Sequence, residues 1–155
     1  MPTKTQEQLN HAKRTGLFGE SLVLAFLQEY ANFCYPTCEG HPADLIVEFG
    51  NNSLYKVQVK TRNKSVKGNY IFPFENHRNM SEMHRSYHID ILAFVFLPQK
   101  RIIFKPFTGY QKYHTYKEKD LLDNIENTSF EKCLESLNNV PKFKSFLGEA
   151  EKKEV

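Results

Sequence analysis

The sequence predicts an α+β fold within the α/β class, with an N-terminal helix ahead of a hairpin of two strands. Three observations support this prediction. Apolar residues recur at helical spacing over 16–29, and two strand-like runs, 43–49 and 54–61, are joined by turn residues. Two further runs, 89–97 and 101–107, are rich in branched and aromatic side chains. Together these segments indicate a sheet with helices packed on it.

Size and composition are those of one soluble globular domain. A chain of 155 residues, 40% hydrophobic and 25% charged, is long enough to bury about two-thirds of its unfolded surface. No apolar run approaches the ~20 residues of a membrane span, and residues 1–10 lack the apolar centre of a signal peptide. We expect a cytoplasmic protein with no membrane partner. Residues 1–155 are predicted to form one domain, with a core at 16–107, a C-terminal helical elaboration at 108–147 and a frayed tail at 148–155.

The first helix is predicted from Gly16 to Glu29. Its broad apolar face is formed by Leu17, Phe18, Val23, Leu24, Phe26 and Leu27. Glu20 lies near the predicted start, where the helix dipole stabilises an acid by about 0.3–1 kcal/mol. The stretch 30–40, which contains Pro36 and Gly40, is expected to be a connector.

The hairpin that follows contains the candidate site. Residues 43–49 are apolar and branched, 50–53 are turn residues, and 54–61 alternate. In the second strand Gln58 and Lys60 share one face, because side chains change face at every residue. A hairpin brings these side chains and Asp44 to one edge of a sheet, where a divalent cation and a phosphate fit together. The alternative is an ordinary half-solvated strand, which shows the same alternation.

Asp44, followed after the hairpin by Gln58-Val59-Lys60, resembles the signature of the PD-(D/E)XK nucleases. The residues around Gln58, Val57-Gln58-Val59-Lys60-Thr61, most resemble the branch that includes a group I intron-encoded homing endonuclease and archaeal Holliday-junction resolvases. Residues 68–70 and 88–94 resemble the strands that follow in homing-type members. The resemblance covers roughly 16–107 and implies a restriction-endonuclease-like mixed central sheet flanked by helices.

The resemblance also implies roles for five residues. Asp44, the side chain of Gln58 and the backbone carbonyl of Val59 are expected to hold Mg²⁺, which Mn²⁺ can replace. Glu20 is expected at a second metal or its water shell. Lys60 is expected to orient the attacking water or to offset charge at phosphorus. The expected catalytic set is therefore Glu20, Asp44, Gln58 and Lys60.

Two departures from the signature affect the metal site. Ala43 separates Pro42 from Asp44, and Gln58 stands where the signature has an acid. A Gln carbonyl oxygen ligates a hard cation but brings no charge, so weaker or retuned metal affinity is expected. Glu48, on the Asp44 face of a regular strand, is a fallback ligand if Glu20 lies far from the site, but a solvated acid at the strand end is the favoured interpretation.

Candidate DNA contacts follow the second strand. Residues 56–67 carry five basic side chains and no acid, and 75–88 is rich in amides, Arg and His. The alternative for both segments is a solvated loop. The candidate contacts are Lys56, Arg62, Lys64, Lys67, Asn69, Asn76, His77, Arg78, Asn79, His84 and Arg85.

The rest of the chain supplies more strands and a helix. A third strand is predicted at 68–74, and 89–97 with 101–107 form a second hairpin in which Pro106 indicates an edge position. Tyrosines and lysines alternate after 107, as in a nucleic-acid groove or a sheet cover. Residues 128–131 match a capping box for a short helix. Its inward residues are predicted to be Phe130, Cys133, Leu134 and Leu137.

Three cysteines, an odd number, favour reduced thiols over a disulfide framework. Cys34, Cys38 and His41 lack the spacing and the fourth ligand of a zinc site. A net charge of +3 is only weakly indicative of nucleic-acid binding.

The sequence therefore predicts a metal-dependent endonuclease of duplex DNA, of homing or restriction type. Three alternatives remain open: a structure-selective Holliday-junction resolvase, a non-cleaving DNA-binding module on the same fold, and an unrelated α+β protein with a chance motif. Because two strands must be cut with one site per chain, a homodimer or homotetramer is expected.

Overall fold

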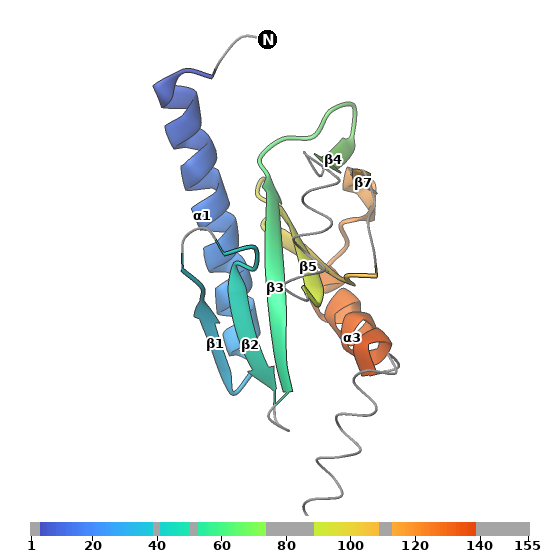
Figure 1. Ribbon diagram of the computed structural model, residues 1–155. Coiled ribbons are helices and arrows are strands. Elements are labelled where there is room, and N and C mark those ends of the chain that lie inside the picture. Colours follow the sequence, from blue (N-terminus) through green and yellow to red (C-terminus); the bar gives the residue numbers. More distant parts are fainter. Residues whose placement is uncertain (1–3, 39–40, 50–52, 74–88, 109–112, 139–155) are drawn as a thin grey trace, which may run out of the picture.

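The computed structural model describes residues 4–38, 41–49, 53–73, 89–108 and 113–138 (Figure 1). Along the described chain the elements are α1 (Gln6–Gln28), β1 (Phe33–Pro36), β2 (Leu45–Phe49), β3 (Ser53–Arg62), β4 (Asn69–Pro73), β5 (Ile91–Phe96), β6 (Arg101–Pro106), β7 (Tyr113–Lys117), the 3-10 helix η1 (Glu118–Asp120) and α3 (Ile125–Asn138). Helices packed on a mixed sheet confirm the predicted fold class.

Helix α1 begins well before the predicted Gly16, because a capping box starts it at Gln6. The Thr5 hydroxyl accepts the Gln8 N–H at 3.2 Å, and the Gln8 side chain accepts the Thr5 N–H at 2.9 Å. Glu20 therefore lies deep inside the helix, and the predicted interaction with the helix dipole at its start is wrong.

The main sheet has the strand order β1-β2-β3-β5-β6. The predicted hairpin is confirmed: β2 and β3 are antiparallel, with Leu45 opposite Val57. Strand β3 runs parallel to β5, which makes the sheet mixed, and β5 pairs antiparallel with β6. Strand β6 is an edge strand, as Pro106 indicated. Strand β1, which was expected to be connector, pairs with β2 at the other edge.

The predicted third strand exists as β4, but it lies outside the main sheet. It pairs antiparallel with β7, a strand that the sequence analysis did not predict. These two strands cover one face of the main sheet through an aromatic cluster. In that cluster the ring centroid of Phe72 lies 4.9 Å from that of Phe94 and 5.4 Å from that of Phe96, and both pairs are edge-to-face.

Helices α1 and α3 cover the other face of the main sheet, where Val23 and Leu27 of α1 meet Phe130 of α3 in one buried cluster. Helix α3 begins at Ile125, so the predicted capping box at 128–131 is wrong: the Thr128 N–H already bonds to the Asn124 carbonyl at 3.0 Å. The predicted inward face is confirmed, because Phe130, Cys133 and Leu137 are buried and Leu134 packs against them. No helix of the described chain is long and apolar enough to span a membrane.

Candidate active site

Asp44 immediately precedes β2 and lies beside the middle of β3, in a local distortion of the ladder. Leu45 pairs with Val57, yet the preceding Asp44 also donates its N–H to the Val57 carbonyl, at 2.8 Å. Two successive residues thus face one residue of β3, which is the pattern of a β-bulge. A bulge re-aims the side chain that it carries. Asp44 therefore departs from the regular alternation of β2.

Backbone groups on both sides hold Asp44 in place. Its carboxylate Oδ2 accepts the Val59 N–H at 2.7 Å, and its carbonyl accepts the Thr37 N–H at 3.0 Å. Because alternate residues of a strand direct their backbone groups to the same side, the Val59 carbonyl points to the same edge of β3 as the Val57 carbonyl. The Asp44 carboxylate and the Val59 carbonyl therefore meet at this edge.

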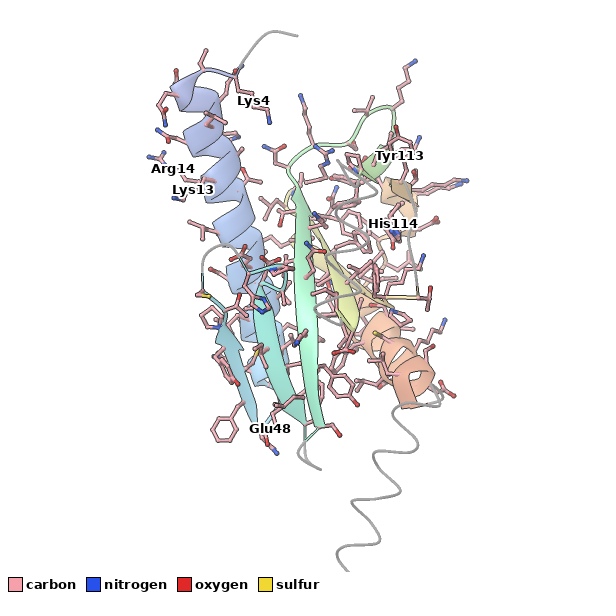
Figure 2. The ribbon with its side chains drawn as sticks, in the orientation of Figure 1. Lys4, Lys13, Arg14, Glu48, Tyr113 and His114 are labelled. Atoms are coloured by element: carbon pink, nitrogen blue, oxygen red, sulfur yellow. The ribbon has the colours of Figure 1, made fainter. Side chains whose placement is uncertain are left out.

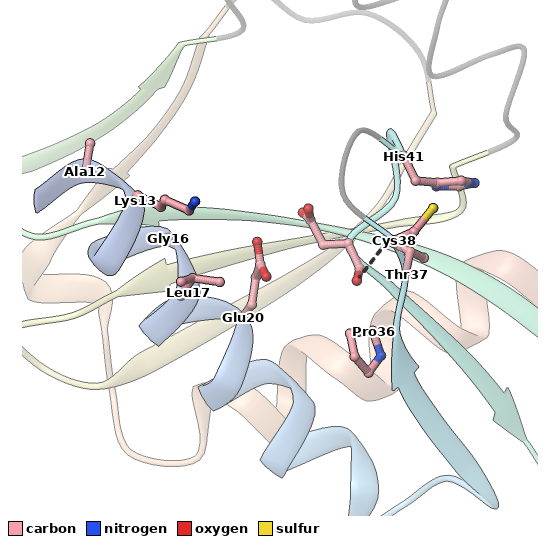
Figure 3. A pocket seen from close by; sticks show the side chains of 10 residues that line it. Ala12, Lys13, Gly16, Leu17, Glu20, Pro36, Thr37, Cys38 and His41 are labelled. Atoms are coloured by element: carbon pink, nitrogen blue, oxygen red, sulfur yellow. Dashed lines mark hydrogen bonds between the residues drawn. The ribbon is translucent and has the colours of Figure 1, made fainter. Parts of the chain in front are cut away.

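Glu20 approaches this edge from α1. Glu20 and Asp44 line one pocket of about 530 Å³, with residues from the end of β1 and the loop before β2 (Figure 3). The helix can lie so close because of Gly19, where a Cβ atom would stand 1.9 Å from the Thr61 Oγ1 of β3. Gly19 thus sets the distance from which Glu20, the next residue, reaches toward the sheet.

The pKa values of both carboxyls are raised. Burial raises the pKa of Glu20, and the negative charge of Asp44 raises it further. Burial also raises the pKa of Asp44, against the Val59 hydrogen bond and the positive charges of Lys60 and His41, which lower it. Two partly dehydrated acids that oppose each other's ionisation are typical of a site that gains from a bound cation.

Gln58 carries an unsatisfied acceptor on β3, although it does not line the pocket of Glu20 and Asp44. It lies between Val57 and Val59, the two residues whose backbone groups bond Asp44. Its side chain is 7% exposed, and its Oε1 has no hydrogen-bond partner in the described chain. An unpaired buried carbonyl oxygen is unfavourable in a protein interior but suits a hard cation. These residues therefore fit a divalent cation that prefers oxygen ligands.

The donors are mixed oxygen groups, not a cluster of acids. Among the described residues there is no group of three or more His, Cys, Asp or Glu side chains placed to hold a metal. The candidate donors are the carboxylates of Glu20 and Asp44, which line the pocket, with the Gln58 amide oxygen and the Val59 carbonyl on β3. Mg²⁺ accepts such a set because it keeps several waters and needs few carboxylates.

Two other acids lie away from this edge. Glu48 stands opposite Leu54 at the far end of β2 and does not line the pocket, as expected of a strand-end acid and not of the fallback ligand (Figure 2). Asp90 precedes β5, and its Oδ2 accepts the Lys56 N–H at 2.9 Å. Asp90 is therefore a strand-entry residue and not a ligand at this edge.

The predicted DNA contacts are only partly described. Lys56 is half-buried in β3, whereas Arg62, Lys64 and Lys67 are exposed at the end of β3 and in the loop after it. Arg62 donates its Nε–H to the Ile71 carbonyl at 2.8 Å. Asn69 begins β4. The remaining candidates lie outside the described residues: Asn76, His77, Arg78, Asn79, His84 and Arg85.

The sequence analysis gave no role to several pocket residues, among them Lys13 and Thr37, and it considered His41 only for a zinc site. Lys13 precedes Glu20 by seven residues, two helical turns, so an earlier helix start would have placed both on one face. Thr37 and His41 had no recognisable signal, because their place depends on β1 pairing with β2.

Comparisons with known proteins identify the fold. No family model matches the chain, and no curated protein matches it. A bacterial homing endonuclease, I-Ssp6803I, is similar over 77% of this chain and 83% of its own, with a TM-score of 0.55 and 20% sequence identity. The chain shares its fold with this homing endonuclease. Hjc, a Holliday junction resolvase of the archaeal hyperthermophile Archaeoglobus fulgidus, is similar over 68% of this chain and 86% of its own, with a TM-score of 0.46 and 16% identity.

Proposed function

We propose that this protein is a divalent-metal-dependent endonuclease that hydrolyses phosphodiester bonds of duplex DNA, of homing or restriction type. The observation that carries the proposal is the meeting of Glu20, Asp44 and the backbone of Val59 at one edge of β3. The fold shared with a homing endonuclease supports it. The Oε1 of Gln58, the residue before Val59, has no hydrogen-bond partner in the described chain and provides a further acceptor for such an ion.

Asp44, Gln58 Oε1 and the Val59 carbonyl would hold Mg²⁺, or Mn²⁺ in its place, and Glu20 would hold a second ion or its water shell. When bound, the ion would polarise the phosphate and promote deprotonation of the attacking water. These effects would supply a large share of the roughly 20 kcal/mol by which an enzyme must lower the barrier to phosphodiester hydrolysis. The Val59 N–H keeps the Asp44 carboxylate oriented. Lys60, whose positive charge acts on Asp44, orients the attacking water or offsets charge at phosphorus.

Contacts to the DNA backbone would come from the exposed end of β3 and the loop after it. Arg62, Lys64 and Lys67 lie there, exposed, and Asn69 follows at the start of β4. Lysine and arginine at such positions contribute salt-dependent affinity without reading sequence. Lys56 and the candidates within 75–88 would complete this surface. A homodimer or homotetramer would supply the second site that double-strand cleavage needs.

The experiment is cleavage of two substrates. Supercoiled plasmid and a synthetic four-way junction are incubated with the purified protein, with Mg²⁺ or with EDTA, and the breaks are mapped. Mg²⁺-dependent cutting of the plasmid at a defined sequence is the expected result, and this cutting should be lost in Asp44→Ala and Lys60→Ala. Preference for the junction would favour a resolvase, and binding in EDTA without any cutting would favour a non-cleaving module. Undiminished cutting by both variants would rule out this site.

A further inference from the structure

Helix α1 contains two glycines whose surroundings are opposite. Gly19 packs against Thr61 so closely that no side chain fits there. Gly16, one turn earlier, has no atom within 4 Å of the place where its Cβ atom would stand. Glycine weakens a helix interior relative to alanine. Packing within the described chain explains Gly19 and does not explain Gly16.

Gly16 lines the pocket beside Asp44. Three segments form this pocket: one face of α1, the end of β1 with Thr37 and Cys38, and the loop from His41 to Asp44 (Figure 3). Its volume of about 530 Å³ is in the range of ligand sites, roughly 300–1,000 Å³. The missing side chain of Gly16 keeps the helix wall of this pocket open.

The two ends of the helix wall carry opposite charges. Lys13, Gly16 and Glu20 follow one another at helical spacing on the same face. Lys13 is exposed and makes no hydrogen bond or ion pair within the described chain. Figure 3 shows its amine directed into the space between α1 and the loop that carries His41. The neighbouring Arg14 does not line the pocket.

We propose that this pocket is a subsite for the sugar-phosphate of the nucleotide next to the bond that is cleaved at Asp44. Lys13 contacts the phosphate of that nucleotide, and Gly16 leaves room for its sugar. The seven residues from Lys13 to Glu20 rise about 10 Å along the helix, so Lys13 contacts a neighbouring phosphate and not the reacting one. The identity of the ligand rests on the proposed function.

The charges of this pocket determine which end of it a DNA phosphate occupies. A phosphate is repelled by Glu20 and Asp44 unless a cation neutralises them, whereas Lys13 attracts it without one. The subsite therefore binds nucleotide in the absence of divalent metal, at the Lys13 end. This property separates the subsite from the metal site by experiment.

Two pairs of variants test the subsite. Gly16→Leu fills the pocket with a residue that has a higher helix propensity than glycine. Ala25→Leu is its control, because Ala25 is exposed on the same helix and does not line the pocket. Lys13→Ala removes the phosphate contact, and Arg14→Ala removes an adjacent charge outside the pocket. We expect Lys13→Ala to weaken binding of duplex DNA in EDTA about tenfold, as loss of a charged hydrogen bond does. Gly16→Leu, which fills the space for the sugar, should weaken the same binding about tenfold as well. The two control variants should change binding less than about twofold, the size of a small surface electrostatic effect.

A second measurement does not depend on cleavage. Deoxythymidine bisphosphate, with one phosphate on each side of the sugar, is titrated into the wild type in EDTA while backbone amide NMR signals are followed. We expect the signals of Gly16 and Leu17 to shift, and the shifts to disappear in Lys13→Ala. Shifts spread over exposed lysines, without change at Gly16, would overturn the subsite.

The outcomes separate the subsite from the nuclease proposal. If the wild type cuts DNA and both pocket variants bind and cut like their controls, the subsite is wrong and the nuclease stands. If the wild type does not cut but the bisphosphate shifts the Gly16 signal, the pocket binds a sugar-phosphate and the nuclease proposal is wrong. If Gly16→Leu does not fold, Lys13→Ala and the titration decide alone.

Discussion

Replacing Glu20 by glutamine should stabilise the protein while it reduces cleavage. Burial and the Asp44 charge both raise the pKa of Glu20, so its ionised form is less favourable in the folded protein than in the unfolded chain. Glutamine has nearly the same shape and no charge. Because Glu20 is partly exposed and solvent screens its charge, we expect a gain on the order of 1 kcal/mol at neutral pH. In a chain of this size that gain raises the melting temperature by about 2–4 °C.

The sign of the effect depends on pH. A raised carboxyl pKa means that the cost of ionising Glu20 is absent well below 4.5, its ordinary value, and complete above the raised value. The melting temperatures of Glu20→Gln and the wild type should therefore differ most at neutral pH and converge as the pH falls through that window. Differential scanning calorimetry in EDTA, across a series of buffers, measures this difference without any bound metal.

A matched substitution tests the reasoning. Glu7 lies in the exposed first turn of the same helix, where the dipole favours an acid, so Glu7→Gln should lower stability slightly. An equal rise in melting temperature in both variants would show that the effect is not specific to the pair with Asp44. A fall in Glu20→Gln at neutral pH would refute the account of the two acids.

Three further predictions concern the framework of the site. Gly19→Ala should cost about 1–3 kcal/mol by denaturant unfolding, because its Cβ meets Thr61, and adding Thr61→Ala should recover part of that loss; full stability of the single variant would contradict the packing. Lys60→Met should abolish cleavage but keep the rise in melting temperature that Mg²⁺ gives the wild type, and loss of that rise would show that Lys60 is needed to bind the ion. Burial, and the Lys105 charge to a lesser extent, lower the pKa of His114 from 6.5 to about 4, so stability should fall as the pH drops between those values. His114→Gln should flatten that fall in pH-dependent unfolding, and an unchanged profile would assign the fall to other groups.

Local patterns were sufficient to predict the central hairpin. Residues 50–53 are turn residues, and apolar side chains lead into the turn from both strands, so pairing between neighbours in sequence was predictable. The same holds for the hairpin of β5 and β6 and for the inward face of α3 around Phe130. In each case the partners lie close in the chain and the pattern is local.

Predictions failed where structure depends on distant pairing or on a signal that was overlooked. Strand β1 is short, largely exposed and contains Pro36, and only its pairing with β2 makes it a strand. Strand β7 has its partner β4 far away in sequence, and the tyrosines and lysines in and around it suggested either a binding groove or a sheet cover. The capping box of Thr5 and Gln8 was visible in the sequence, and recognising it would have corrected the start of α1.

The alternation of side chains along a strand did not predict the geometry of the candidate site. Regular strand geometry put Asp44 and Glu48 on one face, but the bulge before Leu45 re-aims Asp44 toward Val59 and leaves Glu48 remote. A bulge depends on how two strands and their neighbours pack, and no residue type at this position indicates it. The hairpin pattern predicted that Asp44 would lie at one edge with Gln58 and Lys60, and the resemblance to a nuclease signature gave Asp44 its role as a ligand.

Cleavage by one pair of variants tests the account most directly. Asp44→Asn keeps an oxygen for the Val59 N–H but removes the charge, whereas Glu48→Gln makes the equivalent change on the same strand outside the site. With Mg²⁺ and plasmid DNA, we predict that the wild type and Glu48→Gln cut alike and that Asp44→Asn does not cut. Equal cutting by all three proteins, or equal loss in both variants, would contradict the assignment of this edge of β3 as a metal-dependent active site.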